Sequence, residues 1–431
     1  MTITVYPPFG STVNNAIYTQ FGGGTVDAFG RLRVSNPYTI FDSQARFAPS
    51  IDYDYVTNTG ASTSYNANQS SVNLNLTSAS AGATALAQTK RVFPYQPGKG
   101  LLTMQTFVMD APQTGLTQRV GYYGAQNGVY LEQADTQISF VIRTYTGGTV
   151  DNSRYAVQAD WNVDKLDGTG PSGITLDLTK MQILWFDFEW LGSGNLRCGF
   201  IINGVYIVCH IFENANTQSV VYIQTAILPL RYEITATDSV ASANLVQICS
   251  TVISEGGYDE VSQLYEARRG DNGTTIDNNT GLNFTPIVSI RVNSSYYGSV
   301  IIPSAYDFFP TSSGSTGYEV VMIRNGTLTS PTWAGATMCD GQVDVDIGAT
   351  AVTVSSVDDI MQTAFASSSA QAVGDVAVRT LYNFKTQIGY TASLTGNGFG
   401  ASDVLTIAAR GINNSPTGSG TGNLSFYCLT L

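Results

Sequence analysis

The sequence predicts an all-β protein. Charged residues make up only 12% of its 431 residues, whereas Gly, Ser, Thr, Asn, Tyr and Val are frequent. This composition is typical of short strands joined by polar turns. Short runs of β-forming residues also recur between turn signals along most of the chain, and that spacing indicates a sandwich or a barrel. A chain of this length is expected to form about two or three domains.

The arrangement of these runs predicts three parts. Residues 1–45 contain Pro7, Pro8 and a triple glycine and lack apolar periodicity, so they are expected to form an extended arm. Residues 46–262 carry the first series of strand-like runs and are expected to form a β-sandwich. After a polar stretch the pattern restarts, and residues 271–431 are expected to form a second β-rich domain of the sandwich type. The clearest runs of the first series are SVNLNLTSA, LLTMQTFVM, TQISFVIRTY, KMQILWFDFEW, CGFIINGVYIVCHIF and NLVQICSTVIS.

One hairpin can be specified from residues 198–212. The Asn-Gly pair at 203–204 lies between apolar runs and favours a type I′ turn, which needs positive φ at both central residues. A two-residue loop would place Ile202 opposite Val205 and Cys198 opposite Cys209. We expect these two thiols to remain unoxidised in a cytosol. By the two-residue period of a strand, the face expected to join the core carries Phe200, Ile202, Val205, Ile207 and Cys209.

Residues 185–190 alternate between two faces. Phe186, Phe188 and Trp190 are expected to face the core, and the opposite face is expected to meet solvent or a partner. Paired carboxylates beside an aromatic ring are typical of a glycosidase cleft. The E-x-D-x-x-E motif of laminarinase-like sandwiches, however, has tryptophan here in place of both outer glutamates, so hydrolysis is not expected. A carbohydrate-binding face remains as the alternative to a solvated strand face, and its candidate residues are Trp185, Asp187 and Glu189.

Other catalytic and metal patterns are incomplete. Oxygen-bearing residues at 160, 162, 164 and 167 have the spacing of a calcium loop, but Lys165 and Pro171 stand where that pattern needs glycine and glutamate. A solvated turn is the expected structure. His210 is the single histidine and is expected opposite Arg197, facing away from the core, which leaves no base for a nucleophile. The sequence therefore predicts no catalytic residue, no cofactor and no metal.

Charge and cysteine use restrict the partners and the cellular compartment. The formal net charge is −12, and the 20 basic residues form no stripe that could neutralise a run of phosphates. Nucleic acid is therefore not an expected partner. The N-terminus has neither the basic nor the apolar region of a signal peptide, and no apolar run is long enough to span a membrane. Five cysteines without CxxC spacing indicate buried thiols rather than a zinc site or a disulfide framework.

The stretch VDAFGRLRVSNPYTIFDSQARF at 26–47 concentrates charge in a chain that has little of it. Alternation places Arg31 and Arg33 on one side of an extended segment. Two guanidinium groups on one side suit paired contacts with carboxylates. We expect both arginines to be ion-paired, with Asp27 or Asp42 of the same chain or with acids on a neighbour. Docking on a partner and a clip onto the chain's own sandwich both remain open.

The same stretch carries a resemblance. DAFGRLRVSNPYTIFDSQ at 27–44 resembles an N-terminal signature of structural proteins from tailed-bacteriophage virions. The resemblance continues through VFPYQPGKG, RVGYYGAQNGVYLE, the segment 160–200, LPLRYEI and QICSTVISEGGY, and it covers roughly residues 27–260. It implies a concanavalin-like β-sandwich in the tail, baseplate, fibre or capsid surface of a phage, and it implies no enzyme.

Two functions follow as expectations. The first is a non-enzymatic structural component of the virion, made in the host cytoplasm and anchored to other virion proteins by its arm. It is expected to form a homo-oligomer, with a trimer favoured. The alternative is a module that binds or depolymerises carbohydrate on the host surface. In that case a groove is expected to be lined by Trp185, Trp190, Tyr122 and Tyr123.

Overall fold

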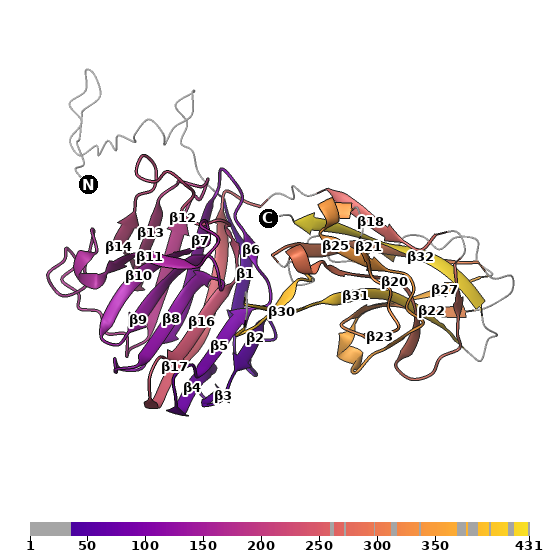
Figure 1. The fold of residues 1–431 in the computed structure, drawn as a ribbon, viewed down its shortest axis with the longest axis horizontal. Coiled ribbons are helices and arrows are strands. Elements are labelled where there is room, and N and C mark those ends of the chain that lie inside the picture. Colours follow the sequence, from indigo (N-terminus) through magenta and orange to yellow (C-terminus); the bar gives the residue numbers. More distant parts are fainter. Residues whose placement is uncertain are drawn as a thin grey trace, which may run out of the picture.

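A computed structural model describes most of the chain and shows two β-rich units that lie next to each other (Figure 1). The elements are strands and short 3₁₀ helices, which confirms the all-β prediction. Within the residues that the structure describes, no helix has the length and apolar character needed to cross a membrane. The described residues are 36–258, 263–270, 273–296, 298–311, 317–335, 338–368, 376–377, 387–395, 398–412 and 418–429.

The first unit is a sandwich of two antiparallel sheets. The sheet that contains β17 has the strand order β14-β13-β12-β7-β17-β4-β3, and β1 also pairs with β17. We call it the β17 sheet. Its strands are β1 (Pro37–Gln44), β3 (Ala61–Asn66), β4 (Ser71–Ala79), β7 (Gly100–Val108), β12 (Gln182–Phe188), β13 (Leu196–Ile202), β14 (Val205–Phe212) and β17 (Val240–Glu255).

The second sheet of the sandwich has the order β11-β10-β9-β8-β16-β5-β2, and we call it the β16 sheet. Aliphatic and aromatic side chains of both sheets meet in one core, because alternate residues of each strand point inward. A short pair, β6 (Phe93–Pro94) and β15 (Ile227–Leu228), lies beside them. The strands are β2 (Tyr53–Thr57), β5 (Thr84–Thr89), β8 (Leu116–Tyr123), β9 (Gly128–Ala134), β10 (Gln137–Thr144), β11 (Asp151–Val157) and β16 (Leu230–Ala236).

The second unit, which we call the C-terminal unit, packs two further antiparallel sheets around its own core. One sheet has the order β18-β32-β21-β28, with β19 also on β32. The other has the order β23-β26-β20-β31-β22-β27, with β25 on β20 and β24 on β25. Its larger strands are β18 (Leu264–Arg268), β20 (Asn283–Val292), β21 (Val300–Pro310), β22 (Gly317–Arg324), β27 (Ile360–Ser367), β31 (Val404–Gly411) and β32 (Gly418–Leu429). The shorter strands are β19 (Thr274–Ile276), β23 (Thr327–Thr329), β24 (Ala334–Gly335), β25 (Val343–Asp346), β26 (Ala351–Thr353) and β28 (Val376–Ala377).

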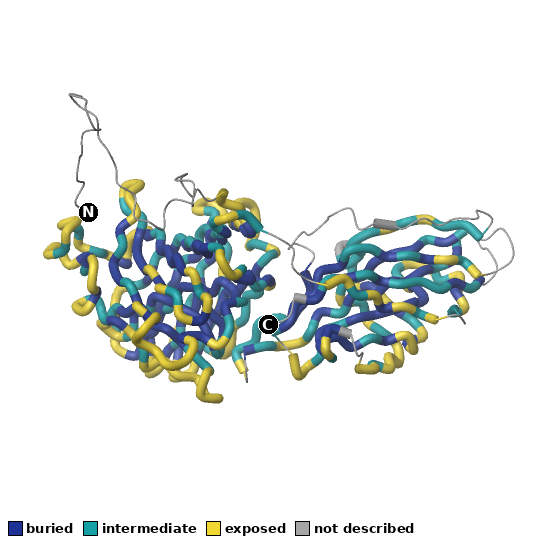
Figure 2. Tube along the Cα trace, turned by 90° about the horizontal axis from the view of Figure 1, so that it is seen from above, coloured by how far each residue is buried: buried dark blue, intermediate teal, exposed yellow. Residues whose placement is uncertain are grey.

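The described contacts between the two units include two segments of the C-terminal unit. Val300 and Ile302 at the start of β21 are buried against the core of the sandwich. A small hairpin of β29 (Tyr390–Ala392) and β30 (Phe399–Ser402) lies beside β2, as Figure 1 shows. In Figure 2 the buried residues fill the interior of both units, and exposed residues mark their outer loops.

The structure corrects the extent of the predicted arm. Residues 37–44 form β1, which pairs with β17 from Pro37 opposite Glu255 to Gln44 opposite Cys249. Ile40 and Phe41 are buried in the sandwich core, and this burial explains why the segment is a strand of the sheet. The part of the predicted arm that precedes β1 lies outside the described residues.

The predicted hairpin forms, with one change in register. Asn203 and Gly204 have φ of 52° and 78°, and Ile202 lies opposite Val205 as expected. A bulge between Cys198 and Gly199, however, places Cys198 opposite His210 instead of Cys209. Of the predicted core face, Phe200, Ile207 and Cys209 are buried, whereas Val205 is 60% exposed because it lies at the turn.

Candidate functional site

The predicted carbohydrate-binding face on β12 is closed. Trp185 is only 3% exposed, and the ring of Tyr206 lies edge-on to it at 5.8 Å between centroids. Asp187 is also buried and forms an ion pair with Arg197. Glu189 alone is exposed. The prediction that Trp185 and Asp187 meet a ligand is therefore wrong, because the facing side chains of β13 and β14 cover them.

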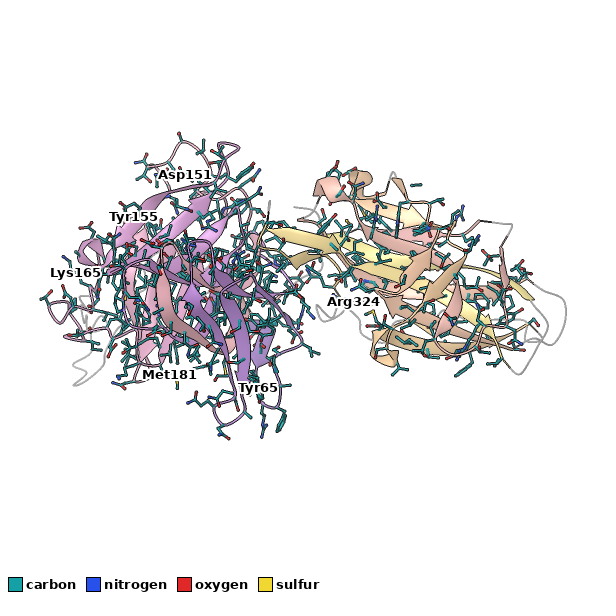
Figure 3. All side chains as sticks on the ribbon, turned by 60° about the horizontal axis from the view of Figure 1, so that its bottom comes forward. Tyr65, Asp151, Tyr155, Lys165, Met181 and Arg324 are labelled. Atoms are coloured by element: carbon teal, nitrogen blue, oxygen red, sulfur yellow. The ribbon has the colours of Figure 1, made fainter. Side chains whose placement is uncertain are left out.

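The other aromatic candidates do not form a groove. Tyr122 lies in the sandwich core, and its hydroxyl is 2.6 Å from the carbonyl oxygens of both Phe93 and Ala226. Tyr123 is fully buried on the opposite face of the same sheet. Trp190 is half-buried and packs against the core. Tyr155 was not a candidate, but it is an exposed aromatic residue of the sandwich, at 54%. Figure 3 shows it at the end of the sandwich that is farthest from the C-terminal unit.

The predicted arm site is only partly described. Arg31, Arg33 and Asp27 lie outside the described residues. Asp42 is exposed on β1 and makes no ion pair within the part of the chain that the structure describes. The described chain begins at Asn36, whose carbonyl oxygen accepts the N–H groups of Gly256 and Gly257 at 3.2 and 2.8 Å. The pairing of the two arginines stays a prediction.

The incomplete calcium loop uses its oxygens internally. Asp164 is buried and accepts the N–H groups of Leu166 and Ser172 at 3.0 and 2.8 Å. This carboxylate is therefore not part of a solvated turn, which corrects the expectation for that residue. Among the described residues, no group of three or more His, Cys, Asp and Glu side chains is placed to hold a metal ion.

His210 also differs from its prediction. The bulge in β13–β14 places it opposite Cys198 rather than Arg197, and its side chain is buried beside Phe212. Nδ1 of the imidazole accepts the N–H of Asn162 at 3.3 Å. Burial and the nearby Arg154 lower the pKa of His210, so the neutral ring is favoured. Its environment is that of a structural residue.

A cleft between the sandwich and the C-terminal unit is a feature that the sequence did not reveal. Its volume is about 370 Å³. The sandwich contributes the loop 124–127 between β8 and β9, together with residues near Lys90 and β15. The C-terminal unit contributes residues around β21, β25 and the β29–β30 hairpin. Amide and hydroxyl side chains that line it are Gln126, Asn127, Gln224, Thr225, Ser295, Ser299, Gln342 and Gln387, and its aromatic rings are Tyr296, Tyr390 and Phe399.

The sandwich wall of the cleft is held by hydrogen bonds between its two loops. Asn127 is buried, and its Oδ1 accepts the N–H of Gln224 at 2.9 Å. The N–H of Gly124 donates to the carbonyl oxygen of Asn127 at 2.8 Å and closes the turn. The Gln224 side chain itself is exposed. Nδ2 of Asn127 also donates to Oε1 of Gln224 at 3.5 Å, so both polar atoms of the Asn127 amide bond within this wall and fix its backbone.

The opposite wall contains two buried glutamines. Ser299 donates from Oγ to Oε1 of Gln342 at 2.5 Å. Gln387 is 4% exposed, and its Oε1 has no hydrogen-bond partner among the described residues. The rings of Tyr390 and Phe399 meet edge-on at 6.2 Å. Burial raises the pKa of Tyr390, so its hydroxyl is protonated at neutral pH.

The electrostatic character of the cleft is nearly neutral. Lys90 is the one ionisable cation among its lining residues that the structure describes, and no carboxylate is among them. Such a site can donate and accept hydrogen bonds to an uncharged polar ligand, and its rings can cover an apolar face. Its described lining residues include no pair of acids for proton transfer.

Comparison with known proteins gives only distant likenesses. No family model and no curated protein matches the chain. A lichenase derived from a mouse hindgut metagenome is 12% identical over 51% of this chain and 100% of its own, with a TM-score of 0.32. A Bauhinia forficata lectin is 11% identical over 52% of this chain and 100% of its own, with a TM-score of 0.31. The CBM2 module of an evolved Dit protein from Lactobacillus casei BL23 phage J-1 is 7% identical over 53% of this chain and 100% of its own, with a TM-score of 0.32. At these scores the likeness says nothing about the ligand or activity of this chain.

Proposed function

We propose that this chain is a non-enzymatic carbohydrate-binding component of a bacteriophage particle, and that the sugar binds in the cleft between its two units. The observation that carries the proposal is the lining of the cleft, which combines amide side chains from both walls with three aromatic rings. Sugars present hydroxyl groups that both donate and accept hydrogen bonds, and amides can answer both roles. The apolar face of a sugar ring packs against an aromatic side chain.

Gln387 supports a ligand with hydroxyl donors. A buried acceptor without a partner costs about 1–3 kcal/mol, and Oε1 of Gln387 is in that position among the described residues. A sugar hydroxyl that donates to it would remove this cost on binding. Gln342 complements it, because Ser299 occupies its Oε1 and the Nε2 group is left to donate. Both glutamines belong to the C-terminal unit and line the cleft.

The size and charge of the cleft also support a small neutral saccharide. Its volume of about 370 Å³ lies in the range of small-molecule sites, roughly 300–1,000 Å³. Glycosidic hydrolysis ordinarily needs two carboxyl groups that flank the scissile bond. The described lining residues include none, and this supports binding without cleavage.

The binding site is tested by changing a buried glutamine. Gln387→Leu removes the unpaired acceptor while it keeps a side chain of similar volume. We expect at least about tenfold weaker binding, which corresponds to ~1.4 kcal/mol, measured by calorimetric titration against a panel of neutral host-surface oligosaccharides. Gln69→Leu is the matched control, because Gln69 is exposed on the turn between β3 and β4. Failure of the wild-type protein to bind any member of the panel at millimolar concentration would contradict the proposal.

The attachment to a phage particle rests on the motif resemblance of residues 27–260. We propose that residues 1–35 bind a neighbouring virion protein and that the chain assembles as a homo-oligomer, with a trimer favoured. Because 37–44 form a strand of the sandwich, a clean test deletes residues 1–35 only. We expect the deleted protein to fold and bind sugar but to be absent from purified particles. Normal incorporation would show that the arm does not attach the protein.

A further inference from the structure

A small buried cluster lies behind the sandwich wall of the cleft, and we call it the Tyr130 cluster. Tyr123, Tyr130 and Val141 form a group separate from the sandwich core, because alternate strand residues point to opposite faces of the β16 sheet. Arg143 at the end of β10 lies over this group and is only 8% exposed. Its Cα pairs across the sheet with Gly128, the residue that follows the cleft loop 124–127.

The guanidinium of Arg143 is fixed by four oxygen atoms. Nη1 donates to the carbonyl oxygens of Gly124 and Ala125 at 3.2 and 3.4 Å. Nε donates to Oδ1 of Asn152 at 3.0 Å, and Nη2 donates to the hydroxyl of Tyr130 at 3.3 Å. The cation also lies 5.1 Å from the ring centroid of Tyr130. Among the described residues no carboxylate lies within ion-pair distance of this cation, although Glu233 is near enough to interact with its charge. Its direct contacts are made by carbonyl oxygens and ring faces.

We propose that Arg143 is a positioning residue for the sugar site, one that sets the place of Asn127 by holding the carbonyl groups of Gly124 and Ala125 at the start of the cleft loop. This inference rests on the proposed function. The loop turns sharply: Gly128 has φ of 136°, and a Cβ there would lie 2.3 Å from Cα of Tyr123. The bond from Gly124 N–H to Asn127 closes the same turn. Arg143 therefore ties the cleft loop to the rigid strands behind it.

Arg119 supplies a matched control on the same face of the sheet. It is partly buried, and its guanidinium lies 5.8 Å from the ring centroid of Tyr130. Its donors point away from the cleft loop, to Glu132 at 2.6 Å and to Glu233 at 2.7 Å. A substitution of Arg119 should therefore disturb the Tyr130 cluster but leave the bonds between Arg143 and the cleft loop in place.

The experiment compares Arg143→Lys and Arg119→Lys by amide hydrogen exchange of the full chain. Lysine keeps the charge but has a single nitrogen in place of the planar fork, so it cannot reproduce the contacts that Nε, Nη1 and Nη2 of Arg143 make at separate positions. In Arg143→Lys we expect the Gly124 amide to exchange at least about tenfold faster, while amides in the core of β16 keep their wild-type rates. In Arg119→Lys we expect the Gly124 rate to stay within about twofold of wild type.

Two results would overturn the inference. One is an unchanged Gly124 rate in Arg143→Lys, and the other is an equal acceleration in both variants, which would indicate a general structural role. If Arg143→Lys does not fold, Asn152→Ala removes the oxygen that accepts from Nε of Arg143 and from the hydroxyl of Tyr130. It leaves the two bonds to the loop carbonyls in place, so it should give a smaller acceleration at Gly124, and no acceleration would equally overturn the inference. Because exchange is measured without ligand, failure of the wild-type protein to bind any sugar would contradict the proposed function separately.

Discussion

The carboxylate of Asp54 in the sandwich accepts the backbone N–H of Ala392 in the C-terminal unit at 3.0 Å from Oδ2. Asp54 lies on β2, and Ala392 is the last residue of β29, whose hairpin carries two aromatic rings of the cleft. The bond therefore links β2 of the sandwich to the hairpin that forms part of the opposite wall. The width of the cleft depends on this contact and on the burial of Val300 and Ile302 against the sandwich.

Removal of that acceptor should loosen the hairpin. In Asp54→Ala we expect the Ala392 amide to lose its protection from hydrogen exchange, with a loss of about 1 kcal/mol in local stability because the bond is only half-buried. Asp54→Asn is the control, since its amide oxygen can still accept the bond. Equal exchange rates in the two variants would show that the hydrogen bond does not hold the hairpin.

A side chain at residue 398 should push the units apart. Gly398 has φ of 84°, and a Cβ there would lie 2.3 Å from Cβ of Ala125 in the cleft loop. We expect Gly398→Ala to lower the free energy of unfolding by about 2–3 kcal/mol, of which about 1 kcal/mol is the left-handed backbone itself. Gly98→Ala is matched in φ, 86°, and a Cβ there meets nothing within 4 Å. If both variants lose the same stability in urea unfolding, the close contact contributes nothing.

Acid should weaken the sandwich through Glu233. Burial by itself raises the pKa of this carboxyl, but Arg231, Arg119 and Arg143 outweigh burial and lower its pKa from 4.5 to about 2. Because the folded pKa is the lower one, the stabilisation is present above about pH 4.5 and is lost as the pH falls from 4.5 to 2. The amount is on the order of 3 kcal/mol. Urea unfolding between pH 2 and 7 should show this loss in the wild type and a flatter profile in Glu233→Gln, which should also be less stable at pH 7. If Glu233→Gln has the same pH profile as the wild type, the Glu233 carboxyl is not the source of the loss of stability in acid.

The thiols of Cys198 and Cys209 should stay reduced and unreactive in the native protein. Both side chains are buried, and burial raises the pKa of each thiol, so little thiolate is present at pH 8. We expect neither to react with iodoacetamide until the protein is denatured. A tryptic peptide spanning both residues that is two daltons light without reductant would instead reveal a disulfide.

The strands were predictable because each strand buries one face, so apolar residues recur at every second position of its sequence. Residues 71–79 and the turn at 203–204 illustrate this, since both were placed correctly from alternation and from the Asn-Gly signal. The β13–β14 bulge was not predictable, because an extra residue leaves no mark in the apolar pattern. Trp185 was placed on the correct face, but its cover comes from Tyr206 on another strand.

The cleft was beyond sequence reasoning for a different reason. Its lining residues lie between Lys90 and Phe399 and belong to loops whose glutamines and tyrosines look like ordinary polar turns. Only the packing of the two units brings them together. Arg143 was equally hidden, because an arginine in a strand is expected to meet solvent or a carboxylate rather than two carbonyl groups.

The separation of 338 residues between Asp54 and Ala392 has a consequence during synthesis. Domains fold from the N-terminus as the chain emerges, at roughly 5–20 residues per second. The sandwich can therefore be complete before the segments that carry Gln342, Gln387 and Phe399 have been synthesised. The cleft is then among the last features to form, so under the proposed function the nascent chain lacks its sugar site.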